Sequence, residues 1–242
     1  MKSEIGSNAG LVSRVVLFEP ATLHERIYWA LRADIIAGKF FPGETISIRK
    51  LAGEIGCSSV PVRDALGRLV AERALDMPNP RAFRIPLMSF DEFCQLNEFR
   101  QIAEGYLIER SAGAITDHEI QEIRAIDEMI EDHIEGASID EALQENVRLM
   151  FLIYHAARLP ILIPHIEGLW LRSGPYLKMR FVEMIAAGHH ASSEGYLAQR
   201  QMIDALSARD GKRAREALVR DFQATVDIYL SEKHFAAMIE KT

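Results

Sequence analysis

The sequence has few of the residues that mark several classes of protein. It contains only two cysteines, Cys57 and Cys94, without metal-ligand spacing, so neither a disulfide framework nor a zinc finger is indicated. No run approaches the roughly 18 apolar residues that a membrane span needs. The first ten residues include Glu4 and lack the apolar stretch of a signal peptide. We therefore expect a cytoplasmic protein with no membrane partner.

Common catalytic motifs are also missing from the sequence. It has no nucleophile elbow, no glycine-rich phosphate loop, no HExxH motif and no paired carboxylates at catalytic spacing. We therefore expect that the protein is not an enzyme.

Charge is divided unevenly along the chain, whose formal charge is −7. Residues 1–86 hold 12 Lys and Arg against 9 Asp and Glu, a balance of +3, whereas residues 87–242 hold 16 against 26, a balance of −10. Recognition of nucleic acid depends on where charge lies rather than on its sum. A basic first part on an acidic body therefore fits DNA binding by the first part.

Helical patterns in the first part predict three short helices. Apolar spacing predicts a helix over 23–37, and Ser47 and Gly56 bracket a second helix of about two turns. A third helix begins at Ser58 or Ser59. Its inward face consists of Val62, Ala65, Leu66 and Leu69. Two short helices joined by a tight glycine-containing turn are the signature of a helix-turn-helix.

Two short strands are predicted after the third helix, at 74–77 and 82–85. Between them lies a proline-rich turn that carries Arg81, and together they would form the wing of a winged helix-turn-helix. We expect no other strand in the chain.

The remainder is predicted to be helical throughout. Capping boxes at Ser89 and Thr116 mark two helix starts. Further helices, separated by proline and glycine, are expected at about 139–158, 160–173, 175–187, 193–208 and 211–238. The predicted fold class is mainly α, a winged helix-turn-helix of three helices and a small β-hairpin followed by an all-α bundle. The predicted division is a flexible segment over 1–20, a DNA-binding domain over 21–86 and an effector-binding and dimerisation domain over 89–242.

The order of features in the first part resembles the winged helix-turn-helix of the GntR family of regulators, and the helical remainder resembles the FCD-like sensing domain of its FadR-type branch. The residues that carry the resemblance are Gly38, Pro42-Gly43, Ile48-Arg49-x-Leu51-Ala52, Ile55-Gly56, Ser58, Pro61-Val62-Arg63-x-Ala65-Leu66 and Leu69. This resemblance implies a sequence-specific transcriptional regulator, a repressor by family default. It would bind double-stranded operator DNA as a homodimer.

The resemblance also implies which residues contact DNA. In that family, residues that match Arg49, Ser58, Pro61 and Arg63 contact the operator. The chain has Ser59 where another arginine is common, and we include Ser59 in the interface. Our last candidate is Arg81, which stands at a wing tip where glycine is common and would contact the minor groove or a phosphate.

The helix before Pro160 resembles the FadR-type sensor pattern, in which an Asp and a His four residues apart bind a metal. Here Asn146 and Met150 stand at those positions, and Gln199 and Asp221 stand where two further family histidines would fall. An amide pair, a thioether and one carboxylate suit a divalent metal poorly. We therefore expect that the metal site is lost and that no cofactor is bound.

Loss of the metal does not by itself abolish sensing. The same four residues can converge around a pocket for an organic effector, for which a carboxylate is one candidate. Arg100 matches an arginine usual in the family and would either pair such a ligand bidentately or form an internal salt bridge with Glu104. Arg172 is a further candidate. A polar remnant that binds nothing specific is the alternative.

Two other functions stay open at this point. One is a helical enzyme that depends on a metal or metabolite and has kept an accessory head. The other is a protein-interaction module whose winged helix no longer contacts DNA.

Overall fold

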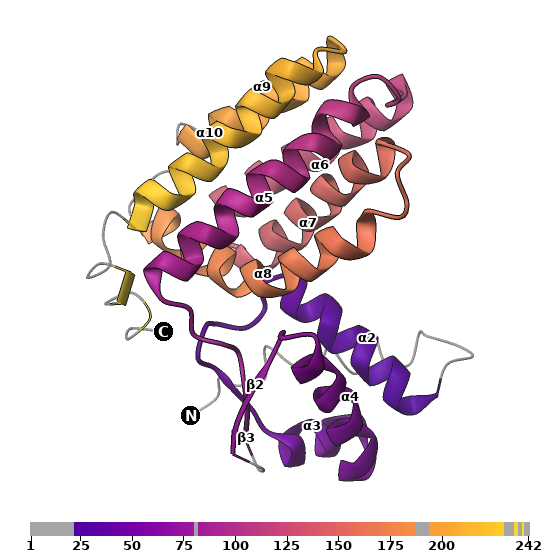
Figure 1. Ribbon diagram of the computed structural model, residues 1–242, viewed down its shortest axis with the longest axis vertical. Helices are drawn as coiled ribbons and strands as arrows, with labels where there is room; N and C mark the ends of the chain where they lie inside the picture. The colour runs from indigo at the N-terminus through magenta and orange to yellow at the C-terminus, as the bar shows by residue number, and fades with distance from the viewer. Residues whose placement is uncertain (1–21, 80–81, 187–193, 230–234, 237–238, 240–242) are drawn as a thin grey trace.

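The computed structural model describes residues 22–79, 82–186, 194–229, 235–236 and 239. They form a small winged-helix unit beneath a larger helical bundle (Figure 1). The winged-helix unit consists of α2 (Leu23–Ile36), β1 (Thr45–Ile46), α3 (Ile48–Ile55), α4 (Ser59–Ala71), β2 (Asp76–Asn79) and β3 (Ala82–Arg84). The bundle consists of α5 (Phe90–Ser111), α6 (Asp117–Glu135), α7 (Ile139–Ala156), α8 (Ile163–Ala186), α9 (Glu194–Ser207) and α10 (Gly211–Tyr229). No described helix is long and apolar enough to cross a membrane.

The mainly helical fold class is confirmed, but the sheet has one strand more than we expected. Its order is β1-β3-β2, and both pairings are antiparallel. The extra strand, β1, pairs Thr45 with Arg84 and Ile46 with Phe83. The prediction that only the wing contains strands was therefore wrong. Two residues are too short to show an alternating pattern, and β1 is a strand only because β3 lies beside it.

The helix-turn-helix begins with the capping that the sequence predicts. The Ser47 hydroxyl accepts a hydrogen bond from the backbone N–H of Lys50 at 3.3 Å, and Gly56 ends α3 in the left-handed conformation with a φ of 73°. The predicted inward face of α4 is buried at all four positions. That face packs on α2 and holds α4 with its other side outward.

Capping boxes also begin α5 and α6, as the sequence predicts. The Ser89 hydroxyl accepts from the Glu92 N–H, and the Glu92 carboxylate accepts from the Ser89 N–H. Thr116 and Glu119 make the same reciprocal pair. In the bundle, α10 packs on both α9 and α5, and α6 packs on α7.

The helix α8 differs from our prediction. We expected a break at Gly174-Pro175, but the helix is continuous from Ile163 to Ala186 with Pro175 inside it. Proline removes one backbone hydrogen bond and usually ends a helix. Here Trp170 before the proline and Phe181 after it are both buried in the main hydrophobic core, so one core anchors the two halves of the helix.

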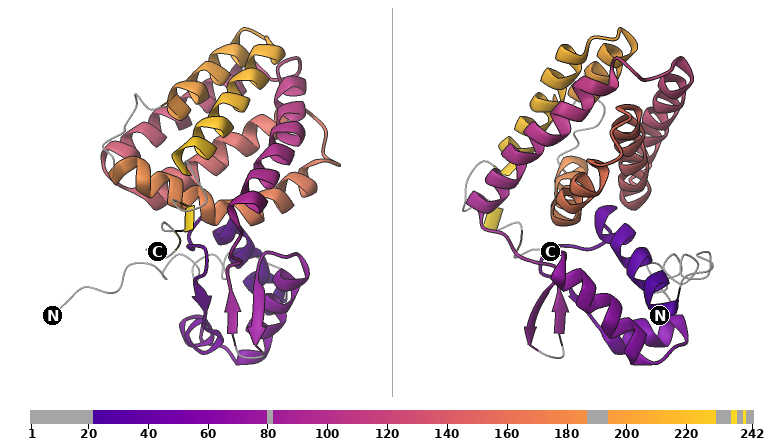
Figure 2. Two further views of the ribbon diagram at one scale, coloured as in Figure 1. Left: turned by 60° about the vertical axis from the view of Figure 1, so that its left-hand side comes forward. Right: turned by 45° about the vertical axis from the view of Figure 1, so that its right-hand side comes forward.

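The same helix joins the bundle to the winged-helix unit. In two views α8 lies across the end of α2 (Figures 1 and 2), and the two helices are in contact. A Cβ added to Gly174 would lie 2.3 Å from the Ile35 carbonyl oxygen and 2.7 Å from that of Ile36. This approach is possible only because residue 174 has no side chain.

Candidate nucleic-acid interface and ligand pocket

The outer side of the helix-turn-helix is a free polar surface. Arg49 at the start of α3 and Arg63 on α4 are both exposed, and neither forms an ion pair with another described residue. Ser58 and Ser59 are exposed, and Pro61 is half-buried. Four of the six predicted DNA contacts therefore lie at the N-terminal end of α4, and a fifth, Arg49, lies at the start of α3. The sixth, Arg81, lies outside the described residues.

Ser58 could either cap α4 or contact DNA, and its hydrogen bonding bears on which of the two it does. It is the N-cap residue of α4, yet its hydroxyl makes no capping hydrogen bond, in contrast to Ser47 at the start of α3. The N–H groups of a helix's first turn attract a phosphate, and a free hydroxyl beside them adds a further donor. Exposed Val60, at 66%, lies in the same turn and was not predicted. An apolar side chain there can contact a thymine methyl group.

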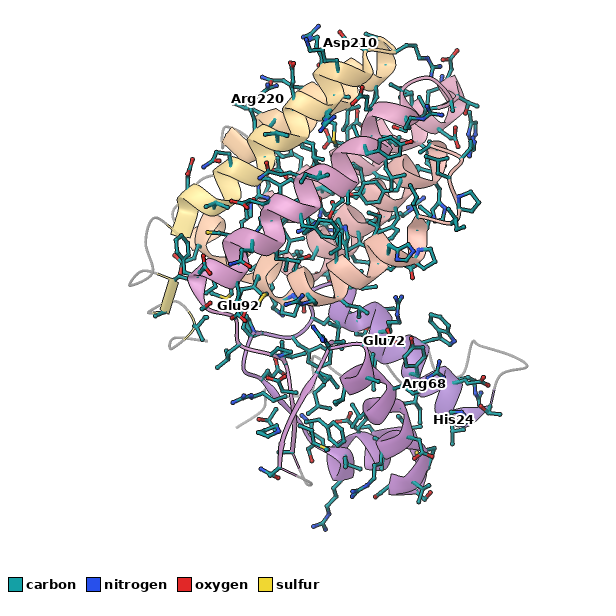
Figure 3. All side chains as sticks on the ribbon, viewed as in Figure 1. His24, Arg68, Glu72, Glu92, Asp210 and Arg220 are labelled. Atoms are coloured by element: carbon teal, nitrogen blue, oxygen red, sulfur yellow. The ribbon has the colours of Figure 1, made fainter. Side chains whose placement is uncertain are left out.

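The opposite end of α4 is held by α2. The Tyr28 hydroxyl donates to Glu72, and the Arg68 guanidinium lies 3.9 Å from the centre of the Tyr28 ring. Figure 3 shows Arg68 and Glu72 on the side of α4 that faces α2. Burial, followed by the bond to Glu72, raises the pKa of Tyr28 to about 12, so the phenol keeps the proton that it donates. These contacts fix the angle at which α4 presents its free end.

Inside the bundle, five of the six predicted effector contacts line one cavity of about 60 Å³. They come from four helices, α5, α7, α9 and α10. The five are Arg100, Asn146, Met150, Gln199 and Asp221. The rest of the wall is mainly apolar and includes Phe93, Ile130, Trp170 and Phe222. The sequence therefore indicated which residues line the cavity, but it did not indicate which hydrogen-bond partner each of them has.

Arg100 is engaged inside the wall of this cavity. Its guanidinium donates to Glu104 through Nε at 2.6 Å and through Nη2 at 3.3 Å. It also lies between the rings of Trp170 and Phe222, at 4.9 and 4.7 Å from their centres. The sequence left two roles open for Arg100, a ligand contact and an internal salt bridge. The structure shows the internal salt bridge with Glu104.

Glu104 is completely buried and accepts a hydrogen bond from a second residue, Tyr154. The Tyr154 hydroxyl donates to it, and burial, then the negative charge of Glu104, raises the pKa of Tyr154 well above its ordinary value. Three buried polar side chains, Arg100, Glu104 and Tyr154, therefore satisfy one another next to the cavity.

Asp221 is paired with a residue that sequence reasoning missed. The Arg180 guanidinium on α8 donates from Nη2 to Asp221 Oδ1 at 2.7 Å. Gly195 in the first turn of α9 closes over this pair, because a Cβ there would lie 2.1 Å from Arg180 Nη2 and 2.9 Å from Asp221 Oδ1. The signal for Arg180 was present in the sequence, since a single arginine follows Ser173 and Leu177 at helical spacing in an otherwise apolar stripe.

Gln199 is also occupied. Its side-chain amide donates to Asp127 Oδ1 at 2.9 Å. Burial raises the pKa of Asp127, while the hydrogen bond from Gln199 and the charge of Arg200 lower it.

These partners do not suit a metal ion of the kind that the FadR-type pattern binds. The single carboxylate of the matching set, Asp221, is already neutralised by Arg180, and a cation placed there would meet the guanidinium charge. Among the described residues, no group of three or more His, Cys, Asp or Glu is arranged to hold a metal. Asn146, Met150 and Gln199 add no imidazole.

The structure corrects the sixth prediction for this pocket. Arg172 lies in a separate surface depression between the wing and α5, beside Glu92, Met77 and Leu87. It is one residue before Ser173, which does line the cavity, so it points from another side of α8.

Contacts between the winged-helix unit and the bundle concentrate on α8. Arg32 of α2 donates to Glu167 of α8 at 2.8 Å and also reaches Glu72 at the end of α4 at 3.3 Å. Tyr176 of α8 holds the linker, because its hydroxyl accepts from the Met88 N–H at 2.6 Å and donates to the Pro86 carbonyl at 3.2 Å. The helix that supplies Arg180 to the cavity therefore also contacts α2 and the linker.

Comparison with known proteins gives two family matches. Residues 23–85 match the model of bacterial regulatory proteins of the gntR family, and residues 95–224 match the FCD domain. The HTH-type transcriptional regulator McbR of Escherichia coli is 27% identical over 198 residues, which cover 82% of this chain and 88% of McbR. The transcriptional repressor GlaR of the same organism is 33% identical over 81 residues, 34% of this chain and 37% of GlaR.

Solved structures agree with these matches. The structure of E. coli McbR superimposes with a TM-score of 0.78 at 25% identity and covers 87% of this chain and 98% of McbR. A GntR-type transcriptional regulator from Rhodococcus has a TM-score of 0.69 at 15% identity over 86% of this chain and 97% of its own, which shows a shared fold.

Proposed function

This chain belongs to the GntR family of bacterial regulatory proteins and carries an FCD domain, and from that premise we propose how it performs transcriptional regulation. Two copies present their α4 helices to successive half-sites of a near-palindromic operator. A small molecule in the bundle cavity changes the placement of the two winged-helix units and with it the affinity for DNA. We propose repression as the direction, in line with GlaR, and action in the cytoplasm without a catalytic step.

One observation carries the DNA-binding part of this proposal. The free end of α4 carries Arg63, Ser58 and Ser59, and the start of α3 carries Arg49. All four side chains are exposed. Exposed arginines and hydroxyls around a helix N-terminus match the phosphates and base edges of a DNA groove. This surface also favours DNA binding over the alternative of a protein-interaction module.

The route from effector to DNA rests on α8. This helix lines the cavity with Ser173 and Arg180, contacts α2 through Gly174 and Glu167, and holds the linker through Tyr176. A packed helix transmits a shift at one end to its other contacts. A ligand that binds one placement of α8 better than another therefore biases the winged-helix unit.

A stripe on α5 supports assembly into a homodimer. Phe99, Ile102 and Tyr106 follow one helix face and are 56%, 62% and 46% exposed. Three large apolar side chains in a row on the surface mark an interaction site. We assign this stripe to a second copy of the chain, because a near-palindromic operator requires a two-fold symmetric pair of recognition helices.

The test of this function is binding to selected DNA. Duplexes bound by the full chain are selected from a random library, and affinity for the consensus is then measured by fluorescence anisotropy at several salt concentrations. We expect Arg63→Ala to weaken binding by about 1–3 kcal/mol, or about fivefold to 150-fold. If Arg63 contacts a phosphate, the salt slope also falls by about one.

The matched control is Arg213→Ala, which removes an exposed arginine of α10 on the far side of the bundle. It should leave the affinity unchanged. Equal affinity of the Arg63→Ala variant and the native chain, or a failure to enrich any duplex, would overturn the assignment.

A further inference from the structure

The wall of the bundle cavity includes buried polar groups that the protein itself does not satisfy, among them two on α8. Arg180 Nε and the Ser173 hydroxyl have no hydrogen-bond partner among the described residues. The two residues are 8% and 3% exposed, both line the cavity, and they lie seven positions apart on α8, which places them on the same face. Buried polar groups are nearly always paired, so unpaired ones in a cavity wall indicate a ligand.

The chemistry of these groups indicates an anionic partner. An arginine Nε–H can only donate, and a serine hydroxyl can donate as well, so the missing partner must offer acceptor oxygens. The other charges of the wall are already balanced, since Arg100 pairs with Glu104 and Arg180 Nη2 pairs with Asp221. The Nε–H of Arg180 is therefore an unused donor of a charged guanidinium, and a ligand that accepts from it must share that guanidinium with Asp221.

Size and polarity restrict the ligand further. The cavity holds about 60 Å³, and one water needs about 10–15 Å³ measured in the same way, so it has room for about four to six groups of that size. The wall also contains Asn97, Tyr196 and Thr225, but most of its other side chains are apolar, and they include Leu177 and Phe181 of α8. A short aliphatic tail fits such surroundings, and a long chain does not.

We propose that Arg180 and Ser173 bind the carboxylate of a short aliphatic acid directly, so that a guanidinium in this chain takes the part that a metal ion plays in the FadR-type sensor pattern. The proposal rests on the function given above, because the cavity is the effector pocket named there. Asp221 competes with the ligand for the same guanidinium and so limits the affinity. Because of this competition, removal of the Asp221 charge should tighten binding of the ligand.

The test uses the full chain and sodium butyrate, which has six non-hydrogen atoms. Binding is measured by isothermal titration, with butyramide as the neutral isostere and octanoate as the long acid, each with and without EDTA. We expect butyrate to bind at least tenfold more tightly than either comparison compound, and EDTA to change nothing.

Two variants test the residues. Ser173→Ala removes one hydrogen bond to a charged group and should weaken butyrate about tenfold. Asp221→Asn removes the competing charge and should strengthen butyrate binding severalfold. If butyrate instead bound through a metal, the same change would weaken binding, because Asp221 is the only carboxylate of the four residues that match the metal-binding pattern. Thermal melting of each variant checks that it is folded, and binding of the native chain to butyrate decides the proposal if a variant is not.

Several results would overturn the proposal. These are no binding of butyrate, equal binding of butyramide, loss of binding in EDTA, or weaker binding by the Asp221→Asn variant. Anisotropy with the selected duplex separates this failure from that of the proposed function. A chain that binds the duplex but not butyrate refutes only the ligand assignment, and a chain that never binds a duplex refutes the regulator itself.

Discussion

Replacement of Arg100 by methionine should destabilise the protein strongly, because it leaves a charge without its partner. Glu104 is completely buried, and two of its three hydrogen bonds come from Arg100. Removing one member of a buried ion pair typically costs about 3–5 kcal/mol. The Tyr154 hydroxyl still donates to Glu104 in the variant, so we expect a loss near the lower end, about 3 kcal/mol.

The double variant Arg100→Met with Glu104→Met separates the charge from the packing. It removes both charges and leaves only the Tyr154 hydroxyl without a partner, at a cost of about 1–3 kcal/mol. We therefore expect it to be more stable than the single Arg100→Met variant.

The assay is urea unfolding followed by far-ultraviolet circular dichroism, with the slope of the transition compared between variants. A single variant within about 1 kcal/mol of the native chain would refute the reasoning. Butyrate titration of the same variant separates the two roles of Arg100. If the stability were unchanged and butyrate binding were lost, Arg100 would be the ligand anchor rather than part of the wall.

Two further predictions concern packing between units. Ile102→Glu places a charge in the middle of the exposed α5 stripe and should convert a dimer into monomers in analytical ultracentrifugation, so a dimer that persists would place the interface elsewhere. Gly174→Ala should lower the stability by about 1–3 kcal/mol, because the new methyl group meets the Ile35 carbonyl oxygen. The matched control, Gly168→Ala on the same helix, has no atom within 4 Å of its new methyl group and should be neutral or stabilising by up to about 1 kcal/mol. Equal melting temperatures for these two variants would contradict the close contact of α8 with α2.

The sequence was sufficient for features that depend on neighbours along the chain. Helix starts at Ser47, Ser89 and Thr116 were predicted because a capping residue and the N–H that it accepts from lie three positions apart. The buried face of α4 was predicted because helical periodicity places its apolar residues on one side, and the same argument left Arg63 outward.

Features that depend on distant segments were decided by tertiary structure. The strand β1 exists because β3 is beside it, and α8 continues through Pro175 because one core holds both of its halves. Likewise, Arg180 meets Asp221 across 41 positions of the chain. A sequence specifies which side chains face inward, but the partner that each one meets depends on how the helices pack together.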